Sequence, residues 1–148
     1  MKTFAFAATV FASLAAAASP YWYITALQSL DTTSTTLESS LQFTFEDAST
    51  GLTTTCSYVN SPGSGRPVTV STPTPCENSQ VQFTYIQTSA KTGQIAITLQ
   101  HLNAAGNLQG EQNGTGIADL ACQADEAKSG TTCYAQNTEI IPGPETGA

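Results

Sequence analysis

The sequence predicts a small all-β domain, folded as a single antiparallel β-barrel or a two-sheet sandwich and held together by two disulfides. Three observations predict this fold. Apolar and polar residues alternate along two stretches that have the pattern of hairpins. Ser and Thr make up 35 of the 130 residues that follow position 18, and β-branched Thr suits a pleated surface. Four Cys follow an N-terminal segment that is typical of secreted proteins.

The N-terminal segment has the three parts of a signal peptide. Lys2 supplies a positive charge, residues 3–14 form a short apolar stretch, and Ala16 and Ala18 give the small-x-small cleavage pattern. A membrane anchor would need about 20 apolar residues, which is longer than this stretch. We therefore expect a signal peptide at 1–18, one β-barrel domain at 19–141 and a flexible tail at 142–148. The mature protein is expected to be secreted and extracellular.

Net charge excludes two classes of partner. Once the segment 1–18 is removed, Arg66, Lys91 and Lys128 stand against eleven Asp and Glu, a net charge of −8. Nucleic-acid binding needs clustered Lys and Arg for the phosphates. Anionic membranes repel a chain of this charge in the same way. We expect neither nucleic acid nor membrane as a partner.

The strands are predicted from alternation and turn residues. Residues 41–46 and 52–58 flank a turn at 47–51, and residues 81–85 and 95–99 flank a turn at 89–93. An opening strand is predicted at 21–27 and a closing one at 134–141. Residues 107–112 are a weaker prediction, and 117–122 could instead form a helical turn capped by Thr115. The Pro- and Gly-rich stretch 60–67 and the stretch 71–75 are expected to be loops.

The four Cys are best explained as disulfides. Cys56, Cys76, Cys122 and Cys133 are an even set in a chain predicted to be secreted, so two bridges are expected. Three pairings are possible, and the nearest-neighbour pairing closes short loops. Zinc is disfavoured because the chain has one His and no C-x-x-C pair.

Catalytic motifs are sparse in this sequence. His101 is the single His, and it has no nucleophile in a recognisable arrangement and no G-x-S-x-G elbow. The pairs Glu46-Asp47 and Asp125-Glu126 lie at predicted turns, where solvated acids are ordinary, and no spacing predicts a glycosidase cleft. The D-x-D-x-D-G pattern of calcium loops is absent. We therefore predict a protein that is not an enzyme and needs no cofactor or metal.

Two further features are candidate binding or modification sites. Tyr21, Trp22 and Tyr23 could stack on sugars, but we favour core packing, with Trp22 inside and the tyrosines partly exposed or the reverse. The triplet Asn113-Gly114-Thr115 is a glycosylation sequon, which we expect in a Gly-rich loop.

Over about residues 21–141 the chain resembles the Alternaria major-allergen-like family of small secreted fungal proteins. The resemblance is carried by the aromatic first strand at 21–24, the hairpin 41–58 ending near a Cys, Cys76-Glu77-Asn78-Ser79 before the alternating 81–85, and the short-spaced Cys122 and Cys133. It implies a small antiparallel β-barrel with the disulfides Cys56–Cys76 and Cys122–Cys133. The founding allergen's extra N-terminal Cys, which can join two chains, has no counterpart here, so a monomer or a non-covalent dimer is expected.

The resemblance also implies how such a protein acts. Members are secreted allergens, effectors or elicitors that meet plant defence proteins, without an established enzymatic activity, and a small phenolic ligand has been proposed for the founding allergen. Our first hypothesis is a non-enzymatic secreted protein that binds a host defence protein through its surface, with loops 60–75 and 104–116 as contacts. The alternative is a binding module for a small apolar ligand or a cell-wall glycan.

Overall fold

The computed structural model describes residues 20–62 and 68–147, so the expected signal peptide at 1–18 lies outside the described residues. The described chain folds as β-strands and one short 3-10 turn, which confirms the all-β prediction. In chain order the elements are β1 (Trp22–Thr32), β2 (Ser40–Asp47), β3 (Leu52–Val59), β4 (Thr69–Pro75), β5 (Val81–Ser89), β6 (Thr92–Leu102), β7 (Leu108–Asp125), η1 (Glu126–Lys128), β8 (Gly130–Ala135), β9 (Thr138–Ile140) and β10 (Thr146–Gly147).

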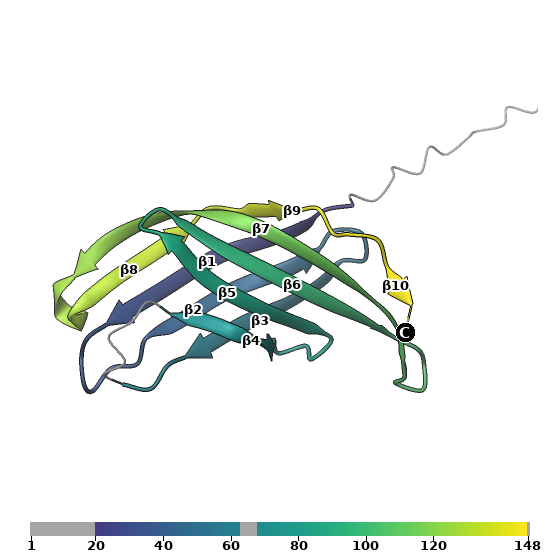
Figure 1. Cartoon of the computed structure of the whole chain (residues 1–148), viewed down its shortest axis with the longest axis horizontal. Coiled ribbons are helices and arrows are strands. Elements are labelled where there is room, and N and C mark those ends of the chain that lie inside the picture. The colour runs from purple at the N-terminus through teal and green to yellow at the C-terminus, as the bar shows by residue number, and fades with distance from the viewer. Residues whose placement is uncertain (1–19, 63–67, 148) are drawn as a thin grey trace, which may run out of the picture.

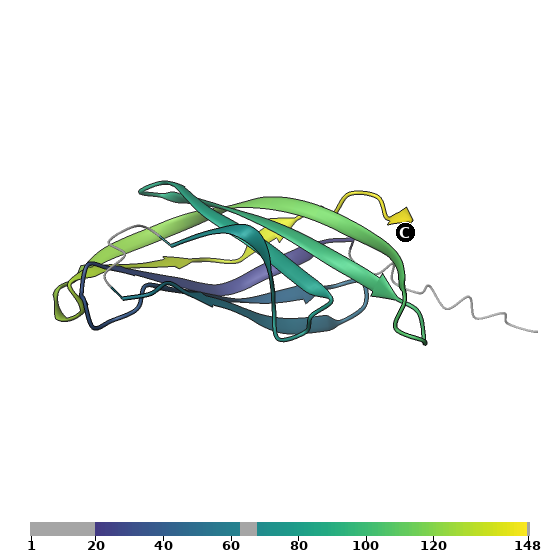
Figure 2. The same ribbon diagram turned by 60° about the horizontal axis from the view of Figure 1, so that its bottom comes forward.

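The strands form one antiparallel sheet that curls into a half-barrel (Figures 1 and 2). The order across the sheet is β3-β2-β1-β8-β7-β6-β5-β4, with β9 paired to β1 and β10 paired to β7. Both predicted hairpins are present: β2–β3 pairs without a register shift, and β5–β6 pairs with one shift, between Gln87 and Ser89. The curl brings the two edge strands, β3 and β4, toward each other, which protects edges that would otherwise invite pairing with another chain.

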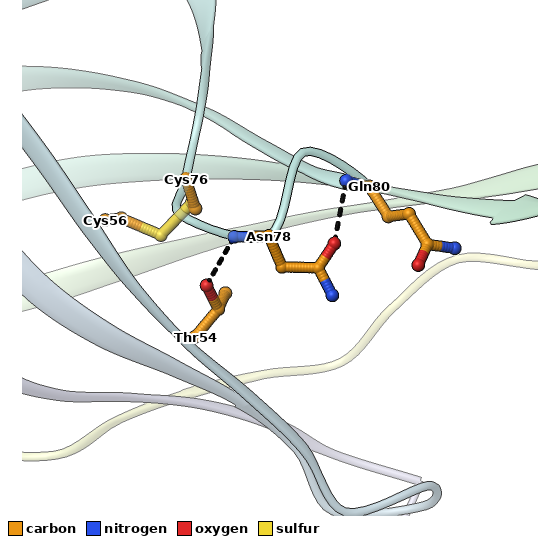
Figure 3. The surroundings of a disulfide bond; sticks show 5 residues. All are labelled: Thr54, Cys56, Cys76, Asn78 and Gln80. Carbon is orange, nitrogen blue, oxygen red and sulfur yellow. Dashed lines mark hydrogen bonds between the residues drawn. A yellow bond between two sulfur atoms is a disulfide. The ribbon is translucent and has the colours of Figure 1, made fainter.

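A disulfide closes the seam between the edges of the sheet (Figure 3). Cys56 lies in β3 and Cys76 directly follows β4, and both are buried. Beyond the bridge, the backbone N–H of Asn78 donates to Thr54 Oγ1 at 2.9 Å, and that of Glu77 donates to the Thr55 carbonyl at 2.9 Å. The seam is therefore held by one disulfide and these two hydrogen bonds.

The second disulfide joins neighbouring strands. Cys122 in β7 is directly opposite Cys133 in β8, with their Cα atoms 4.0 Å apart. The two bridges, Cys56–Cys76 and Cys122–Cys133, are the pairing that the family resemblance implied.

The inward-facing residues of the alternating strands form the core on the concave side of the sheet. Trp22 is 1% exposed, and its ring meets Phe45 edge to face at 5.4 Å. Phe43 and Phe83 make a second edge-to-face pair at 5.0 Å between opposite halves of the curl. Such aromatic pairs contribute about 0.5–1.5 kcal/mol beyond the burial of their area. The prediction of core packing is confirmed, and of its two alternatives the structure has Trp22 inside with the flanking tyrosines partly exposed.

Strand β1 is longer than predicted because it changes partner at a bulge. Ala26 has a φ of 52°, and the register with β2 shifts between Thr25 and Gln28. Before the bulge β1 pairs with β9, and after it with β8. The single closing strand predicted at 134–141 is for this reason two strands, β8 and β9.

Two loop expectations were wrong, and the helical alternative for one uncertain strand is not adopted. Residues 71–75 belong to β4, an edge strand whose register with β5 shifts, which is where Pro is tolerated in a sheet. The stretch 117–122 is not a helical turn, because Ile117 and Asp119 are exposed while Ala118 and Leu120 are buried, a period of two. It belongs to β7, an 18-residue strand that also takes in most of the loop expected at 104–116.

Residues 142–148 were expected to be a flexible tail. In the structure Thr146 and Gly147 pair with Glu111 and Gly110 of β7 as strand β10. The backbone N–H of Gly143 donates to the Asn113 carbonyl at 2.8 Å. The described part of this segment therefore lies along β7.

Candidate binding sites

A cavity opens at one end of the half-barrel, beside the seam. Its volume is about 350 Å³, and it is lined by Asp47, Thr50, Gly51, Leu52, Gln80, Leu99, Gln100 and His101. The turn between β2 and β3 forms one wall, and the chain entering β5 and the end of β6 form the other. Leu52 and Leu99 supply apolar surface, while Gln80 and Gln100 supply amides, a mixture that suits a small molecule.

Asp47 is a structural residue at the edge of this cavity. Its side chain is 2% exposed. Its carboxylate accepts hydrogen bonds from the Ser49 backbone N–H at 2.9 Å, the Ser49 hydroxyl at 2.6 Å and the Thr50 hydroxyl at 2.9 Å. Glu46 points to the opposite face of the strand. The adjacent acids therefore do not form a catalytic pair on one surface.

His101 lies near the end of β6, as predicted, opposite Gly110 of β7. Its Nε2 is 3.2 Å from Gln112 Oε1, and Gln112 Nε2 in turn donates to the Gly143 carbonyl at 3.2 Å. These contacts join β6, β7 and the C-terminal segment. Among the residues that the structure describes, the imidazole has one hydrogen-bond partner, an amide side chain, an arrangement that fits a structural role.

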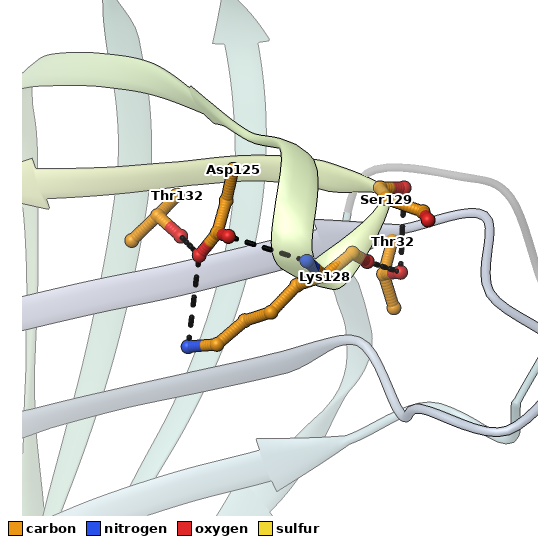
Figure 4. A network of polar contacts seen from close by, with 5 residues as sticks. All are labelled: Thr32, Asp125, Lys128, Ser129 and Thr132. Atoms are coloured by element: carbon orange, nitrogen blue, oxygen red, sulfur yellow. Dashed lines mark hydrogen bonds and ion pairs between the residues drawn. The ribbon is translucent and has the colours of Figure 1, made fainter.

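Of the second acidic pair, Asp125 and Glu126, Asp125 is part of a polar network at the C-terminal end of β7 (Figure 4). One carboxylate oxygen of Asp125 accepts from the Lys128 backbone N–H at 3.2 Å, and the other lies 3.7 Å from Lys128 Nζ. The Thr32 hydroxyl donates to the Lys128 carbonyl, so η1 is fastened to the end of β1. Asp125 therefore caps η1, and Glu126 beside it is exposed.

Asp31, near the end of β1, interacts electrostatically with Tyr85 of β5, and no sequence pattern indicated this pair. The Val68 backbone N–H donates to Asp31 Oδ1 at 2.7 Å. Burial raises the pKa of Asp31 above its ordinary 3.8, and the hydrogen bond from Val68 partly opposes this rise. Burial and, next, the Asp31 charge raise the pKa of Tyr85 to about 12. The Tyr85 hydroxyl is buried and has no hydrogen-bond partner among the described residues.

The tyrosines flanking Trp22 lie on the outer face of the sheet. Tyr21 and Tyr23 are partly exposed, with ring centroids 6.4 Å apart and planes tilted by 54°. Tyr23 is directly opposite Glu46 of β2 and Glu139 of β9. Alternation alone predicts that Tyr23, Glu46 and Glu139 each point outward. It cannot predict that β1, β2 and β9 bring these three side chains together.

The glycosylation sequon lies on a strand instead of the Gly-rich loop that we expected. Asn113 and Thr115 are exposed positions of β7, and the intervening Gly114 is buried. Asn113 Oδ1 accepts a hydrogen bond from the Thr98 hydroxyl at 2.6 Å. The side-chain nitrogen, which is the atom that carries an N-linked glycan, makes no hydrogen bond among the described residues.

Strands β4 and β7 replace much of the two predicted contact loops. Within the range 60–75, residues 63–67 lie outside the described part of the chain and 69–75 form β4. Within the range 104–116 only the turn before Leu108 remains a loop. Of these two ranges, the described residues therefore offer a partner mainly strand surface, in β4 and β7.

Three general features bear on environment, membrane spans and metal binding. The two disulfides indicate an oxidising environment. Over 20–62 and 68–147, no helix is long and apolar enough to cross a membrane. Over the same residues, no three His, Cys, Asp or Glu side chains gather as a set of metal ligands.

No protein-family model matches the chain, and no curated protein matches its sequence. Among solved structures, the crystal structure of the Alternaria alternata allergen Alt a 1 is similar, with a TM-score of 0.60 and 16% sequence identity. The match covers 84% of this chain and 88% of that one. Together with the half-barrel and its two bridges, the match shows that this chain has an Alt a 1-like fold.

Proposed function

We propose that this chain is a secreted, non-enzymatic protein that acts by binding a partner through its surface, as an allergen-, effector- or elicitor-like protein at a host interface. The signal-like segment and the two disulfides support secretion into an oxidising space. The fold is similar to that of an Alternaria alternata allergen, which supports the allergen-like part of the proposal. The fold alone does not assign a function, so the surface must carry the rest of the case.

The observation that carries the proposal is the uncompensated acidic surface. All eleven acids lie in the described residues, and Asp47 is the one that is fully buried. Among described side chains, Asp125 is the one acid with an ion-pair partner, Lys128. A surface of this kind attracts cationic partners over several ångströms and repels anionic ones. A basic host defence protein fits this charge.

The test is capture from plant apoplastic fluid on the immobilised mature protein. We expect specific host proteins to be retained at low salt and released as salt rises, because long-range attraction is screened. The matched control is the same chain, reduced and alkylated, which keeps every carboxylate but loses the fold. Retention of no protein by the folded chain, or equal retention on both, would contradict the proposal.

A second function is favoured by the cavity at the end of the barrel. Its volume of about 350 Å³ falls within the range of small-molecule sites, and Leu52 and Leu99 offer an apolar wall to a phenolic or similar ligand. Thermal unfolding in the presence of phenolics and wall glycans tests this alternative. A ligand should raise Tm in the natural protein and not in Gln100→Trp, whose larger side chain would fill the cavity.

A further inference from the structure

The register of three strands places one tyrosine between two carboxylates. Tyr23 of β1 is directly opposite Glu46 of β2 on one side and Glu139 of β9 on the other. Trp22 and Ile24 are buried, so Tyr23 points outward from the half-barrel. Glu139 is exposed, and Glu46 and Tyr23 are partly exposed. Tyr21, Tyr23, Glu46 and Glu139 are named here the tyrosine–glutamate face.

The fold makes no visible use of these carboxylates. Among the described residues neither the Glu46 nor the Glu139 carboxylate has a hydrogen-bond or ion-pair partner. Lys128 is paired with Asp125 and fastened beside Thr32. Thr32 follows Tyr23 by nine positions, about 30 Å along an extended strand. Lys91 lies in the β5–β6 turn, where its carbonyl accepts from the Leu120 N–H at 2.8 Å. The face is therefore acidic, and neither of these two lysines forms an ion pair with its carboxylates.

We propose that the tyrosine–glutamate face binds the arginine side chains of an extended basic segment of a partner protein. The proposal rests on the surface-binding function proposed above and names its site and the chemistry of its partner. A guanidinium stacks over the Tyr23 ring, whose electron-rich face attracts a cation. Its N–H groups donate to the flanking carboxylates, which accept the planar fork of an arginine in a bidentate manner.

The spacing favours a peptide over a metal ion. Neighbouring strands lie about 4.7–4.9 Å apart, so carboxylates on the two strands that flank β1 are separated by roughly 9–10 Å at their bases. One calcium ion needs six or more oxygens at about 2.3–2.6 Å, which two carboxylates so far apart do not supply. Arginines two positions apart on an extended segment project from the same side, about 6.6 Å apart. Their long side chains span the remaining distance.

The test uses a five-residue glycine peptide with arginine at its second and fourth positions. The controls are the same peptide with lysine and with uncharged citrulline at those positions. Binding is measured by amide chemical shifts of the folded, disulfide-bonded protein. We expect shifts at residues 22–24, 45–47 and 138–140, in the order arginine, then lysine, with none for citrulline. Shifts confined to another surface, or equal shifts with citrulline, would overturn the proposal.

Variants separate the face from net charge. The double variant Glu46→Gln and Glu139→Gln should weaken binding of the arginine peptide about tenfold, because it removes two exposed charge pairs whose effects on affinity multiply. Glu77→Gln with Glu126→Gln changes the net charge equally and should leave affinity within about twofold. Tyr23→Phe keeps the ring and should bind as the natural protein does, whereas Tyr23→Leu should weaken binding about two- to fivefold. Equal losses in both glutamine doubles would show binding by net charge alone and refute the site.

The outcome is independent of the capture experiment. If host proteins are retained but the arginine peptide does not bind this face, the proposed site fails and surface binding stands. If the peptide binds here but the folded chain retains no host protein, the proposed function fails and the arginine site stands.

Discussion

The side chain of Ile140 occupies the space in which a Cβ atom on Gly114 would stand. That atom would lie 2.6 Å from Ile140 Cγ2 and 3.2 Å from Trp22 Cζ3. Gly116, the next inward position of β7, faces Ile140 Cγ1 at 2.6 Å in the same way. Two glycines on one face of a strand thus let β9 and the core tryptophan approach β7 closely, and the reason for glycine here is space.

The first prediction concerns this contact. Gly114→Ala should lower the free energy of unfolding by about 1–3 kcal/mol through overpacking, and Ile140→Ala by about 2–5 kcal/mol through a cavity. The double variant should lose clearly less than the sum, because the new methyl group enters the vacated space. Urea unfolding measures all three. Gly147→Ala is the control, because its Cβ would meet no atom within 4 Å. Strict additivity would contradict the contact.

The second prediction is an alkaline loss of stability centred on Tyr85. The pKa of Tyr85 is raised from 10.0 to about 12 by burial and by the Asp31 charge. Because the pKa is higher in the folded state, the contribution of Tyr85 to stability is fully present below pH 10. This contribution is lost as the pH rises through about 12. Two pKa units correspond to roughly 2–3 kcal/mol. Unfolding measured from pH 9 to 12 should show this loss.

Tyr85→Phe separates this effect from general alkaline unfolding. It should flatten the pH dependence, and at pH 7 it should be neutral or stabilising, because the hydroxyl is buried without a hydrogen-bond partner in the described structure. Tyr134→Phe is the control, since Tyr134 is 49% exposed. The same alkaline loss in Tyr85→Phe as in the natural protein would rule out the assignment to Tyr85.

The third prediction distinguishes the two disulfides. Cys56 and Cys76 are 20 positions apart and Cys122 and Cys133 are 11 apart, so loop closure predicts similar stabilisation, about 3 kcal/mol each. Their structural effects should differ. Replacing the first pair by Ala should increase hydrogen exchange in β3 and β4 because it opens the seam. Replacing the second should leave β7 and β8 protected by their ladder. Equal exchange patterns would contradict the seam.

Sequence reasoning predicted what depends on local patterns. Alternation placed both hairpins, and the family resemblance implied the disulfide pairing. Alternation put Trp22 and the flanking tyrosines on opposite faces but left open which face was buried. It missed β4, because edge pairing with β5 overrides the low strand propensity of Pro. It also missed the Tyr23–Glu139 and Asp31–Tyr85 relationships, because each joins strands far apart in the chain. Such register depends on the whole curl of the sheet, which a single stretch of sequence does not encode.

The fourth prediction is an N-linked glycan at Asn113. The residue is exposed on β7, and its amide oxygen, not its nitrogen, is engaged by Thr98. Protein secreted by a filamentous fungus should carry extra mass that an endoglycosidase removes. Asn113→Gln and Thr115→Ala should both abolish that mass, since the sequon needs both residues. A natural protein whose intact mass equals that of its polypeptide would contradict the prediction.

The last prediction is that His101 serves the fold and not turnover. Its imidazole contacts Gln112, which in turn donates to the Gly143 carbonyl, so the three residues link β6, β7 and the C-terminal segment. His101→Ala should cost about 1 kcal/mol of stability through the lost hydrogen bond. It should leave capture of the host partner unchanged, because the outer face of β1, β2 and β9 is formed without it. His101→Gln keeps a hydrogen-bonding side chain and should recover part of the lost stability. Thermal unfolding and capture, measured on both variants, distinguish the two roles. A folded His101→Ala protein that has lost its effect on the host, with His101→Gln equally inactive, would contradict this prediction and favour a catalytic role for His101.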